Sequence, residues 1–267
     1  QVMSARRPML WLGSGARHAG DAAKELLELG FGMVTSWAGR GSVAEDHPMN
    51  LGAMNGNGSE SIEHFYRTVD LMLVVGSRLR GHETLDFTVP LPARLIQIDV
   101  DSAANGRTYP CQSFVCGDSR ATLEGLCARI RGRLDIDSAY PGEFRSLKKQ
   151  VRAEFRSSLG PYANFAERLR RVIPRDAIWA RDITISHTTW GTRLFELYSP
   201  RCSVYPVGAG IGEGMPLGIG AAIGSGGRKT VILTGDGGLN FNLGELWTAI
   251  QEGIDAVIIV MNDYGYG

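Results

Sequence analysis

The sequence TVILTGDGGLNFNLGELWTAIQEGIDAVIIVMNDYGYG spans residues 230–267 and decides the fold of the chain around it. Its first apolar run is typical of a buried strand and leads directly into Gly235-Asp236-Gly237-Gly238. A second apolar run, Ala256–Met261, ends at Asn262-Asp263. Because a helical pattern separates the two runs, they are expected as parallel strands of one sheet. Both polar loops then lie at its carboxyl edge, where open α/β sheets bind ligands.

The segment between these strands carries the signals of a helix. Asn242 is a suitable N-cap, and Glu245 three residues later completes a box-like arrangement. Gly253 provides the stop signal. One apolar stripe, typical of an amphipathic helix, is formed by Leu243, Leu246, Trp247 and Ile250.

The residue types in the two loops suit a magnesium site. Asp236 lies between glycines, so its carboxylate is presented by a loop whose own N–H groups can face an anion. Asp263 offers a second oxygen at the neighbouring strand end, and the Gly265 carbonyl offers a third. Together with two diphosphate oxygens and a water, these would complete an octahedral Mg²⁺ site. An ordinary turn with a capping aspartate would explain a lone Gly-Asp-Gly, but the spacing to Asn262 favours the metal site.

Composition excludes several classes of function. The 267 residues contain 28 Lys and Arg against 28 Asp and Glu, so the formal net charge is zero, whereas nucleic-acid and anionic-membrane binders need a basic excess. No apolar run approaches the length of about 18 residues that indicates a membrane helix. The four cysteines show neither paired nor metal-ligand spacing. A soluble chain in the reducing cytoplasm, with no nucleic-acid or membrane partner, is therefore expected.

Apolar strands alternate with amphipathic helices along the rest of the chain, which predicts an α/β fold with parallel sheets. Residues 1–133 contain the first series, including the apolar runs Met9–Leu12 and Leu71–Val75. Residues 134–161 are charged and helical without a strand signal, and are interpreted as a solvated connector. A second series occupies residues 162–267. The expected fold class is thus two parallel-sheet, three-layer αβα (Rossmann-like) units.

The Gly235-Asp236-Gly237 motif, followed by 24 residues and then Asn262-Asp263, resembles the cofactor-binding motif of thiamine diphosphate enzymes. The Glu245-Leu246-x-Thr248-Ala249 pattern inside it and the glycine-rich segment 208–222 are also similar to that family. Three earlier stretches resemble the middle domain of its acetolactate synthase-like branch: GSVAEDHPMNLG (41–52), DLMLVVGSRL (70–79) and IDVDSAANGRTY (98–109). The resemblance implies a middle domain followed by a truncated, N-terminal part of the diphosphate-binding domain.

Carried over position by position, the resemblance implies a set of metal and diphosphate contacts. Asp236, the side chain of Asp263 and the Gly265 carbonyl would ligate Mg²⁺. Gly237 and Gly238 would lie against the diphosphate. The family usually has asparagine at position 263. Aspartate keeps the oxygen ligand but adds a negative charge beside the diphosphate.

Four further residues are implied as cofactor contacts. Ile211 matches the bulky apolar residue that bends the cofactor into a V shape, and its N–H, with the Ala209 carbonyl, would hold the aminopyrimidine ring. Plain core packing of Ile211 is the alternative. Ser186 and His187 fall near the family's second diphosphate loop, but the local pattern RDITISHTTW departs from it. His187 is therefore left open as a diphosphate contact, an orienting residue or a structural one.

The resemblance implies a thiamine diphosphate- and Mg²⁺-dependent carboligase or decarboxylase of small 2-oxo acids, similar to acetolactate synthase and working as a homodimer or homotetramer. Aldehyde lyases and oxalyl-CoA decarboxylase share the motifs and stay open as alternatives. The family's activating glutamate lies on a separate domain that precedes the middle domain, and no glutamate here matches it. The chain is accordingly expected to be a piece of a larger enzyme, with no catalytic residue of its own and no turnover alone.

Two questions about nucleotides stay open in the sequence. The middle domain of some relatives holds FAD or ADP, and Gly13-Ser14-Gly15, Arg40-Gly41 and Asp99 could line such a site, although turns at a sheet edge explain them equally well. A non-catalytic nucleotide-binding or regulatory module is the alternative to an enzyme. Gly-Ser-Gly after a strand supports it, but the spacing is not Gly-x-Gly-x-x-Gly. That alternative does not explain the spacing from Gly-Asp-Gly to Asn262.

Overall fold

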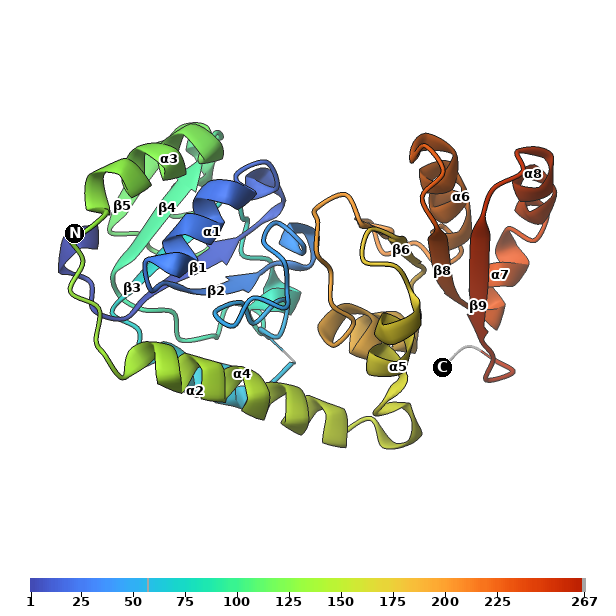
Figure 1. Ribbon diagram of the computed structural model, residues 1–267, viewed down its shortest axis with the longest axis horizontal. Helices are drawn as coiled ribbons and strands as arrows, with labels where there is room; N and C mark the ends of the chain where they lie inside the picture. The colour runs from blue at the N-terminus through green and yellow to red at the C-terminus, as the bar shows by residue number, and fades with distance from the viewer. Residues whose placement is uncertain (57, 266–267) are drawn as a thin grey trace. The chain divides into compact units, whose positions relative to one another are not determined.

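The computed structural model describes residues 1–56 and 58–265, and the chain divides into two compact units. Unit 1 is Gln1–Ser157 and unit 2 is Ser158–Gly267. Each unit contains its own parallel β-sheet with helices packed against it (Figure 1). The expected α/β class with two parallel-sheet units is therefore confirmed. Among the described residues, no helix combines the length and the apolar character needed to cross a bilayer.

Unit 1 has a five-stranded sheet in the order β2-β1-β3-β4-β5, with every neighbouring pair parallel. Every residue of β1 and β3 is buried, as expected for strands covered on both faces. Helices α1 and α3 pack together on one face, and α2 and α4 on the other (Figure 1). The elements are β1 (Pro8–Leu12), α1 (Gly20–Glu28), β2 (Gly32–Thr35), α2 (Glu60–Tyr66), β3 (Leu71–Val75), β4 (Leu95–Asp99), β5 (Ser113–Cys116), α3 (Ser119–Ile130) and α4 (Tyr140–Ser157).

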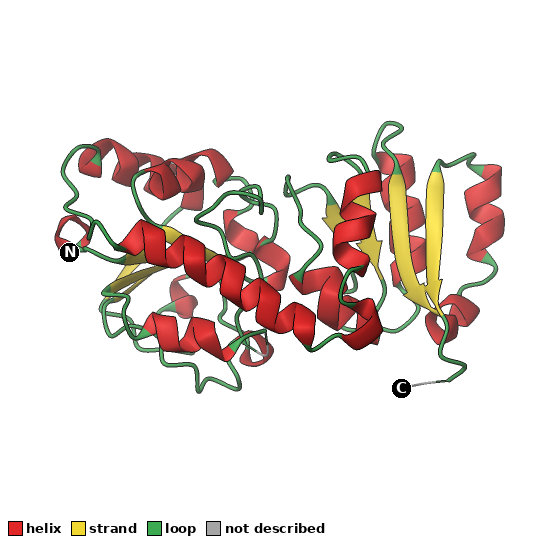
Figure 2. Ribbon diagram, turned by 60° about the horizontal axis from the view of Figure 1, so that its bottom comes forward, coloured by secondary structure: helices red, strands yellow, loops and turns green. Residues whose placement is uncertain are grey.

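Helix α4 occupies most of the segment that was interpreted as a solvated connector, and the structure makes it part of unit 1. Figure 2 shows helices above and below the strands of this unit. The Tyr140 hydroxyl donates to the Pro8 carbonyl on β1 at 2.8 Å, and the Tyr140 and Phe144 rings are 6.0 Å apart. The buried side chains recur every three or four residues, so the helix has an apolar face beneath its charged one. They are Tyr140, Phe144, Leu147, Val151 and Phe155.

Unit 2 has a four-stranded parallel sheet in the order β7-β6-β8-β9. Strands β8 and β9 pair along six residues, from Thr230 opposite Ala256 to Gly235 opposite Met261. The two polar loops therefore leave neighbouring strands at the same edge, as the sequence predicts. The elements are α5 (Phe165–Val172), β6 (Ile178–Arg181), β7 (Ser203–Val204), α6 (Gly214–Gly224), β8 (Thr230–Gly235), α7 (Asp236–Phe241), α8 (Glu245–Gln251) and β9 (Ala256–Met261).

The two faces of this second sheet are both covered. Successive residues of a strand point to opposite faces, and on β6 Ala180 packs under α6 with Met215 and Ile219. Its neighbour Trp179 stacks on Phe195 with the ring centroids 4.1 Å apart. Each face thus has its own apolar cluster, which gives the three-layer arrangement.

One local expectation about the helix before β9 is wrong. Asn242 does not cap it: the Asn242 side-chain amide donates to the Gly212 carbonyl at 2.9 Å, and the N-cap of α8 is Gly244. Within the apolar stripe, Leu246 packs partly buried against the α6 cluster, whereas Trp247 is 72% exposed. A short helix that the sequence did not indicate, α7, precedes it and starts at Asp236 itself.

Gly32 on β2 tests the packing of α4. A Cβ at this position would come within 2.2 Å of a ring carbon of Phe144 and 2.7 Å of the Tyr140 hydroxyl. Gly32→Ala should therefore lower the free energy of unfolding of unit 1 by about 1–3 kcal/mol, the usual cost of overpacking, as measured by urea denaturation. Gly142→Ala is the matched control, since nothing lies within 4 Å of a Cβ there and α4 is helical at this point. It should be neutral or slightly stabilising; equal stability of the two variants would contradict the packing of α4 on β2.

Candidate functional site

The candidate site of unit 2 lies where the order of its strands reverses direction. From β6 the chain crosses to β7 on one side, and later strands β8 and β9 add on the other. The carboxyl ends of strands at such a switch point are splayed apart and leave a crevice. A cavity of about 440 Å³ opens there, within the range of about 300–1,000 Å³ typical of small-molecule sites. Its walls come chiefly from residues 183–186, 188–190, 235–238, 261–263 and 265.

The three residues expected as metal ligands all line this cavity. Asp236 is the first residue of α7, directly after β8, and Asp263 and Gly265 follow β9. A tight turn shapes the second loop, because the Tyr264 N–H donates to Oδ1 of Asn262 at 2.9 Å and Tyr264 has φ of 62°. Two carboxylates and a backbone carbonyl form an all-oxygen donor set of the kind that a hard cation prefers.

This donor set is small. In the described part of the chain, no group of three or more His, Cys, Asp or Glu side chains gathers where it could hold a metal ion. A cation between Asp236 and Asp263 would thus need further oxygens from the backbone, from water or from an anionic ligand. A diphosphate supplies such oxygens, so the residues present fit a metal that is bound together with a diphosphate.

The residues expected around the cofactor divide into two groups. Ile211, Gly237, Gly238 and Ser186 line the cavity. Ile211 is 49% exposed, which shows that it is not a core residue. His187 lies outside the lining: its side chain is fully buried, with its ring 5.7 Å from the Tyr205 ring.

Ala209 is the second expected contact that does not line the cavity. It has φ of 62°, the left-handed conformation, although it carries a Cβ. Such a conformation costs a non-glycine residue roughly 1–2 kcal/mol. Strained residues of this kind cluster at ligand-binding loops, and this one lies two residues before Ile211.

Sequence reasoning missed the residue that organises the site, Asp182. It directly follows β6, is fully buried, and accepts hydrogen bonds from three segments of the chain. The Gly212 N–H donates to Oδ1 and Oδ2 at 2.9 and 3.0 Å, and the Thr234 hydroxyl donates to Oδ2 at 3.0 Å. Additional backbone donors to Oδ1 are Gly214 at 3.2 Å and Ile183 at 2.8 Å.

Arg181, the last residue of β6, is fully buried as well. Its guanidinium donates to the Thr192 hydroxyl at 2.8 Å and to the Ser203 hydroxyl at 3.1 Å, and lies 5.1 Å from the centroid of the Tyr205 ring. It also donates to the Gly191 carbonyl at 3.3 Å, so it holds the end of the kinked helical segment His187–Gly191 that follows Ser186. The sequence feature that could have revealed both residues is the Arg-Asp pair at the end of an apolar strand. Charged residues are buried at such a position only if they have hydrogen-bond or ion-pair partners.

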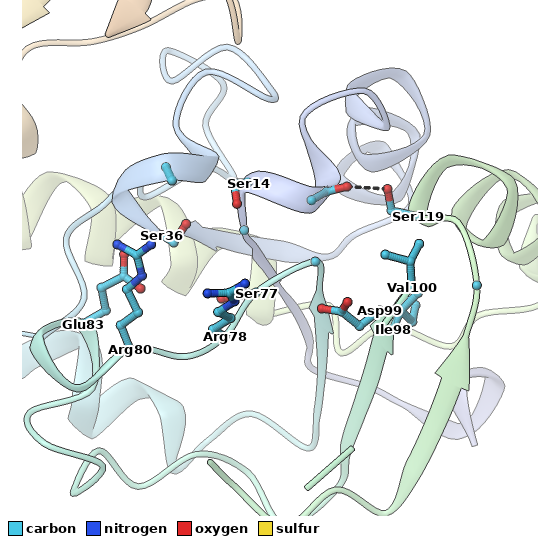
Figure 3. Close-up of a pocket in the computed structure, with 15 residues that line it drawn as sticks. Ser14, Ser36, Ser77, Arg78, Arg80, Glu83, Ile98, Asp99, Val100 and Ser119 are labelled. Atoms are coloured by element: carbon cyan, nitrogen blue, oxygen red, sulfur yellow. Dashed lines mark hydrogen bonds between the residues drawn. The ribbon is translucent and has the colours of Figure 1, made fainter. Parts of the chain in front are cut away.

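Unit 1 has a second crevice, about 320 Å³ in volume, at its own switch point between β1 and β3. Figure 3 shows Arg78 and Arg80, on the loop after β3, and Asp99, at the end of β4, around this hollow. Gly13-Ser14-Gly15 also line it, as expected for a nucleotide site. Arg40 does not: it is 2% exposed and its Nε donates to Oε1 of Glu45 at 2.8 Å.

The Ser119 hydroxyl closes one side of this second crevice by donating to the Gly15 carbonyl at 2.8 Å (Figure 3). Beside it, the Asp118 carboxylate accepts from the Ala121 N–H and lies 2.9 Å from Nε2 of His18. These two hydrogen bonds lower the pKa of Asp118 below its ordinary value.

Comparison with known proteins gives two family matches. Residues 1–126 match the family model described as thiamine pyrophosphate enzyme, central domain, and residues 185–267 match the one described as thiamine pyrophosphate enzyme, C-terminal TPP binding domain. A curated protein from Pseudomonas aeruginosa, a probable 2-ketoarginine decarboxylase, is 33% identical over 98% of this chain and 46% of its own length. The acetolactate synthase isozyme 1 large subunit of Escherichia coli is 26% identical over 100% of this chain and 48% of its own length. The chain thus spans about half the length of these relatives.

Gly238 tests the contact between the Gly235–Gly238 turn and Asp182. A Cβ on Gly238 would lie 2.0 Å from Oδ2 of Asp182 and 3.1 Å from the Thr234 hydroxyl. Gly238→Ala should therefore displace the carboxylate and lower the stability of unit 2 by about 1–3 kcal/mol, seen as a lower midpoint of thermal unfolding. Gly244→Ala, where a Cβ meets nothing within 4 Å, is the control and should change stability by less than about 0.5 kcal/mol. A Gly238→Ala protein as stable as the control would show that the turn is not fixed against Asp182.

Proposed function

The chain belongs to the thiamine pyrophosphate enzyme family. On this basis we propose that it contributes the metal and diphosphate site of a thiamine diphosphate- and Mg²⁺-dependent enzyme acting on 2-oxo acids. One observation carries the proposal. Asp236, Asp263 and Gly265, from two neighbouring strand ends, line a single cavity together with Ile211. A lone Gly-Asp-Gly would occur in an unrelated turn, but its spacing to Asn262 together with a shared cavity lined by two carboxylates would not be expected there.

The residues of the cavity would divide the work of holding the cofactor. The carboxylates of Asp236 and Asp263 and the Gly265 carbonyl would hold Mg²⁺, which neutralises the diphosphate. The backbone at Gly237 and Gly238, which lines the cavity, would lie against the diphosphate, and Ser186, which also lines the cavity, is a proposed further contact. Bound thiamine diphosphate supplies a carbon nucleophile and an electron sink.

The apolar part of the cavity would position the organic rings. Ile211 is half exposed at its edge, so its side chain is available to press against a ligand and is the proposed wedge. The Ala209 carbonyl and the Ile211 N–H would hold the aminopyrimidine ring. The ring of His187 is buried against Tyr205. We therefore propose that His187 orients its loop, and that any contact of this loop with the diphosphate is made by other atoms.

The reaction that we propose first is decarboxylation of a 2-oxo acid. The relative with 33% identity is described as a probable 2-ketoarginine decarboxylase, whereas the acetolactate synthase subunit from Escherichia coli is 26% identical. Carboligation of pyruvate-like acids is the second candidate and rests on that synthase. We propose a homodimer or homotetramer in the cytoplasm. Residues 1–267 alone are proposed to be inactive, since no residue here matches the family's activating glutamate.

The full-length protein should release CO₂ from a 2-oxo acid in the presence of thiamine diphosphate and Mg²⁺. The assay offers pyruvate and 2-ketoarginine separately and follows both CO₂ and new carbon–carbon products. CO₂ without a coupled product supports the decarboxylase, and a coupled product supports the carboligase. A protein that binds the cofactor but consumes neither acid would contradict both, and turnover by residues 1–267 alone would contradict their proposed inactivity.

The metal ligands are tested by two substitutions. Asp236→Ala should abolish Mg²⁺-dependent binding of thiamine diphosphate, because only one carboxylate then remains in the cavity. Asp263→Asn should preserve it, because the amide oxygen can still ligate and the repulsion from the diphosphate is removed. Calorimetric titration with and without EDTA measures both. If Asp263→Asn binds the cofactor normally without any divalent ion, the assignment of position 263 as a ligand is wrong.

The crevice of unit 1 is proposed as a nucleotide site, for FAD or ADP. Arg78 and Arg80 offer positive charge for phosphates, and Asp99 stands at a strand end where it could accept from a ribose hydroxyl. The purified full-length protein should carry a yellow flavin spectrum if the occupant is FAD. A colourless protein that releases an adenine nucleotide on denaturation would favour ADP, and release of neither would argue against the site.

A further inference from the structure

We infer that Asp182 is a positioning residue for the cofactor, and that its buried carboxylate sets the distance between the Ile211 loop and the Gly235–Gly238 turn. The inference rests on the proposed function, since it assigns how that site is held together. Asp182 itself does not line the cavity. It therefore acts through the backbone and side chains that hydrogen-bond to it.

One set of bonds fixes the side of the cavity that carries Ile211. The Gly212 N–H, in the residue directly after Ile211, donates to both carboxylate oxygens of Asp182. The carbonyl of the same glycine accepts from the Asn242 side chain at 2.9 Å. Gly212 has φ of 94°, which glycine adopts without strain. The residue next to the proposed wedge is thus held through both its N–H and its carbonyl, and Asp182 provides the acceptor for the N–H.

A second set fixes the opposite side, where the diphosphate would lie. The hydroxyl of Thr234, which is fully buried and precedes Gly235, donates to Oδ2 of Asp182. Gly238 packs against the same oxygen so closely that a Cβ would be 2.0 Å from it. One carboxylate oxygen therefore contacts the turn directly and through Thr234.

The two sides are coupled because both end on the same rigid, planar group. Asp182, Thr234, Gly212 and Gly214 are all buried, so water cannot readily replace a lost carboxylate oxygen. Removing the carboxylate would leave the buried Gly212 and Gly214 N–H groups, the buried Thr234 hydroxyl and the partly buried Ile183 N–H without this acceptor. The loops would then be free to change their separation, and the rings and diphosphate of one ligand would no longer be bound at a fixed geometry.

The test compares Asp182→Ala and Asp182→Asn in the full-length protein with thiamine diphosphate and Mg²⁺ as the probe. One readout is the dissociation constant by calorimetry. The other is the circular dichroism that the achiral cofactor acquires when it is held in an asymmetric geometry, recorded at saturation. Asp182→Ala should weaken binding at least tenfold and lose more than half of the induced signal per bound cofactor.

Asp182→Asn should restore most of both properties. Its oxygen can occupy the Oδ1 position and accept from Ile183, Gly212 and Gly214, while its amide donates to the Thr234 hydroxyl. We expect binding within threefold of the unmodified protein and an induced signal close to normal. A residue that merely stabilised unit 2 would change the unfolding midpoint and leave the signal per bound cofactor unchanged.

Two further variants keep the result interpretable. Glu45→Gln in unit 1 removes another buried carboxylate charge, one paired with Arg40, and should leave the affinity for the cofactor within twofold. If Asp182→Ala fails to fold, Thr234→Val removes a single hydrogen bond to the carboxylate and should weaken cofactor binding by about three- to tenfold, with a reduced induced signal.

The possible failures are distinguishable. If the unmodified protein does not bind thiamine diphosphate, the proposed function fails. If the unmodified protein binds it, but Asp182→Ala or Thr234→Val binds with the same affinity and the same induced signal, the role of Asp182 is overturned while the proposed function stands.

Discussion

The buried carboxylate of Asp182 is the interaction on which the geometry of unit 2 depends. It satisfies backbone N–H groups from the loop before α6 and a hydroxyl from the end of β8. Leaving a buried donor without its acceptor costs about 1–3 kcal/mol for each group, so the three segments remain together only while the carboxylate is present. The close packing around it also explains two glycines, since a Cβ on Gly214 would lie 2.3 Å from the Asp182 Cα and one on Gly238 would meet the carboxylate itself.

Two buried residues of opposite charge at the end of β6, Arg181 and Asp182, thus connect several segments of unit 2. Asp182 fixes the loops that precede α6 and α7, while Arg181 holds Gly191, Thr192 and Ser203 on the other side. Each unit also opens its crevice at the point where its strand order reverses. In unit 1 the backbones at this point are in such close contact that a Cβ on Gly13 would be 2.1 Å from the Gly76 carbonyl. Several glycines, among them Gly13, Gly76, Gly214 and Gly238, therefore serve close approach of backbone segments at the carboxyl edges of the two sheets.

Most strands, their parallel direction and the meeting of the two polar loops could be predicted from sequence, because they follow from local apolar runs and from the connections between them. The two-residue strand β7 and the order of the strands in each sheet were not predicted. Strand β9 begins and ends at the residues expected, Ala256 and Met261. Helix α7 could not be predicted, since the sequence DGGLNF has low intrinsic helix propensity and is held by its neighbours. The apolar stripe around α8 shows a limit of such spacing: it indicates an amphipathic helix but not how much of the stripe is covered, since Leu246 packs against the core cluster and Trp247 is exposed.

Asp182 escaped sequence reasoning for a physical reason. A charged pair after a short strand is typical of a solvated loop, and the groups that justify its burial lie 30 to 52 residues further along the chain. Among the site residues, Asp236, Asp263, Gly265, Ile211, Gly237, Gly238 and Ser186 share one cavity, and their spacing was visible in the sequence. His187 differs because the direction of its ring depends on tertiary packing against Tyr205, which local sequence does not show.

The most direct measurement of the central claim is a crystal structure of the full-length protein with thiamine diphosphate and Mn²⁺ in place of Mg²⁺, with the metal located by anomalous scattering. The account predicts one strong peak in unit 2, in contact with the carboxylates of Asp236 and Asp263, the Gly265 carbonyl and the diphosphate. It also predicts that Ile211 contacts the cofactor rings. A metal peak elsewhere with the cofactor bound, or a cofactor that occupies another part of the protein, would contradict it.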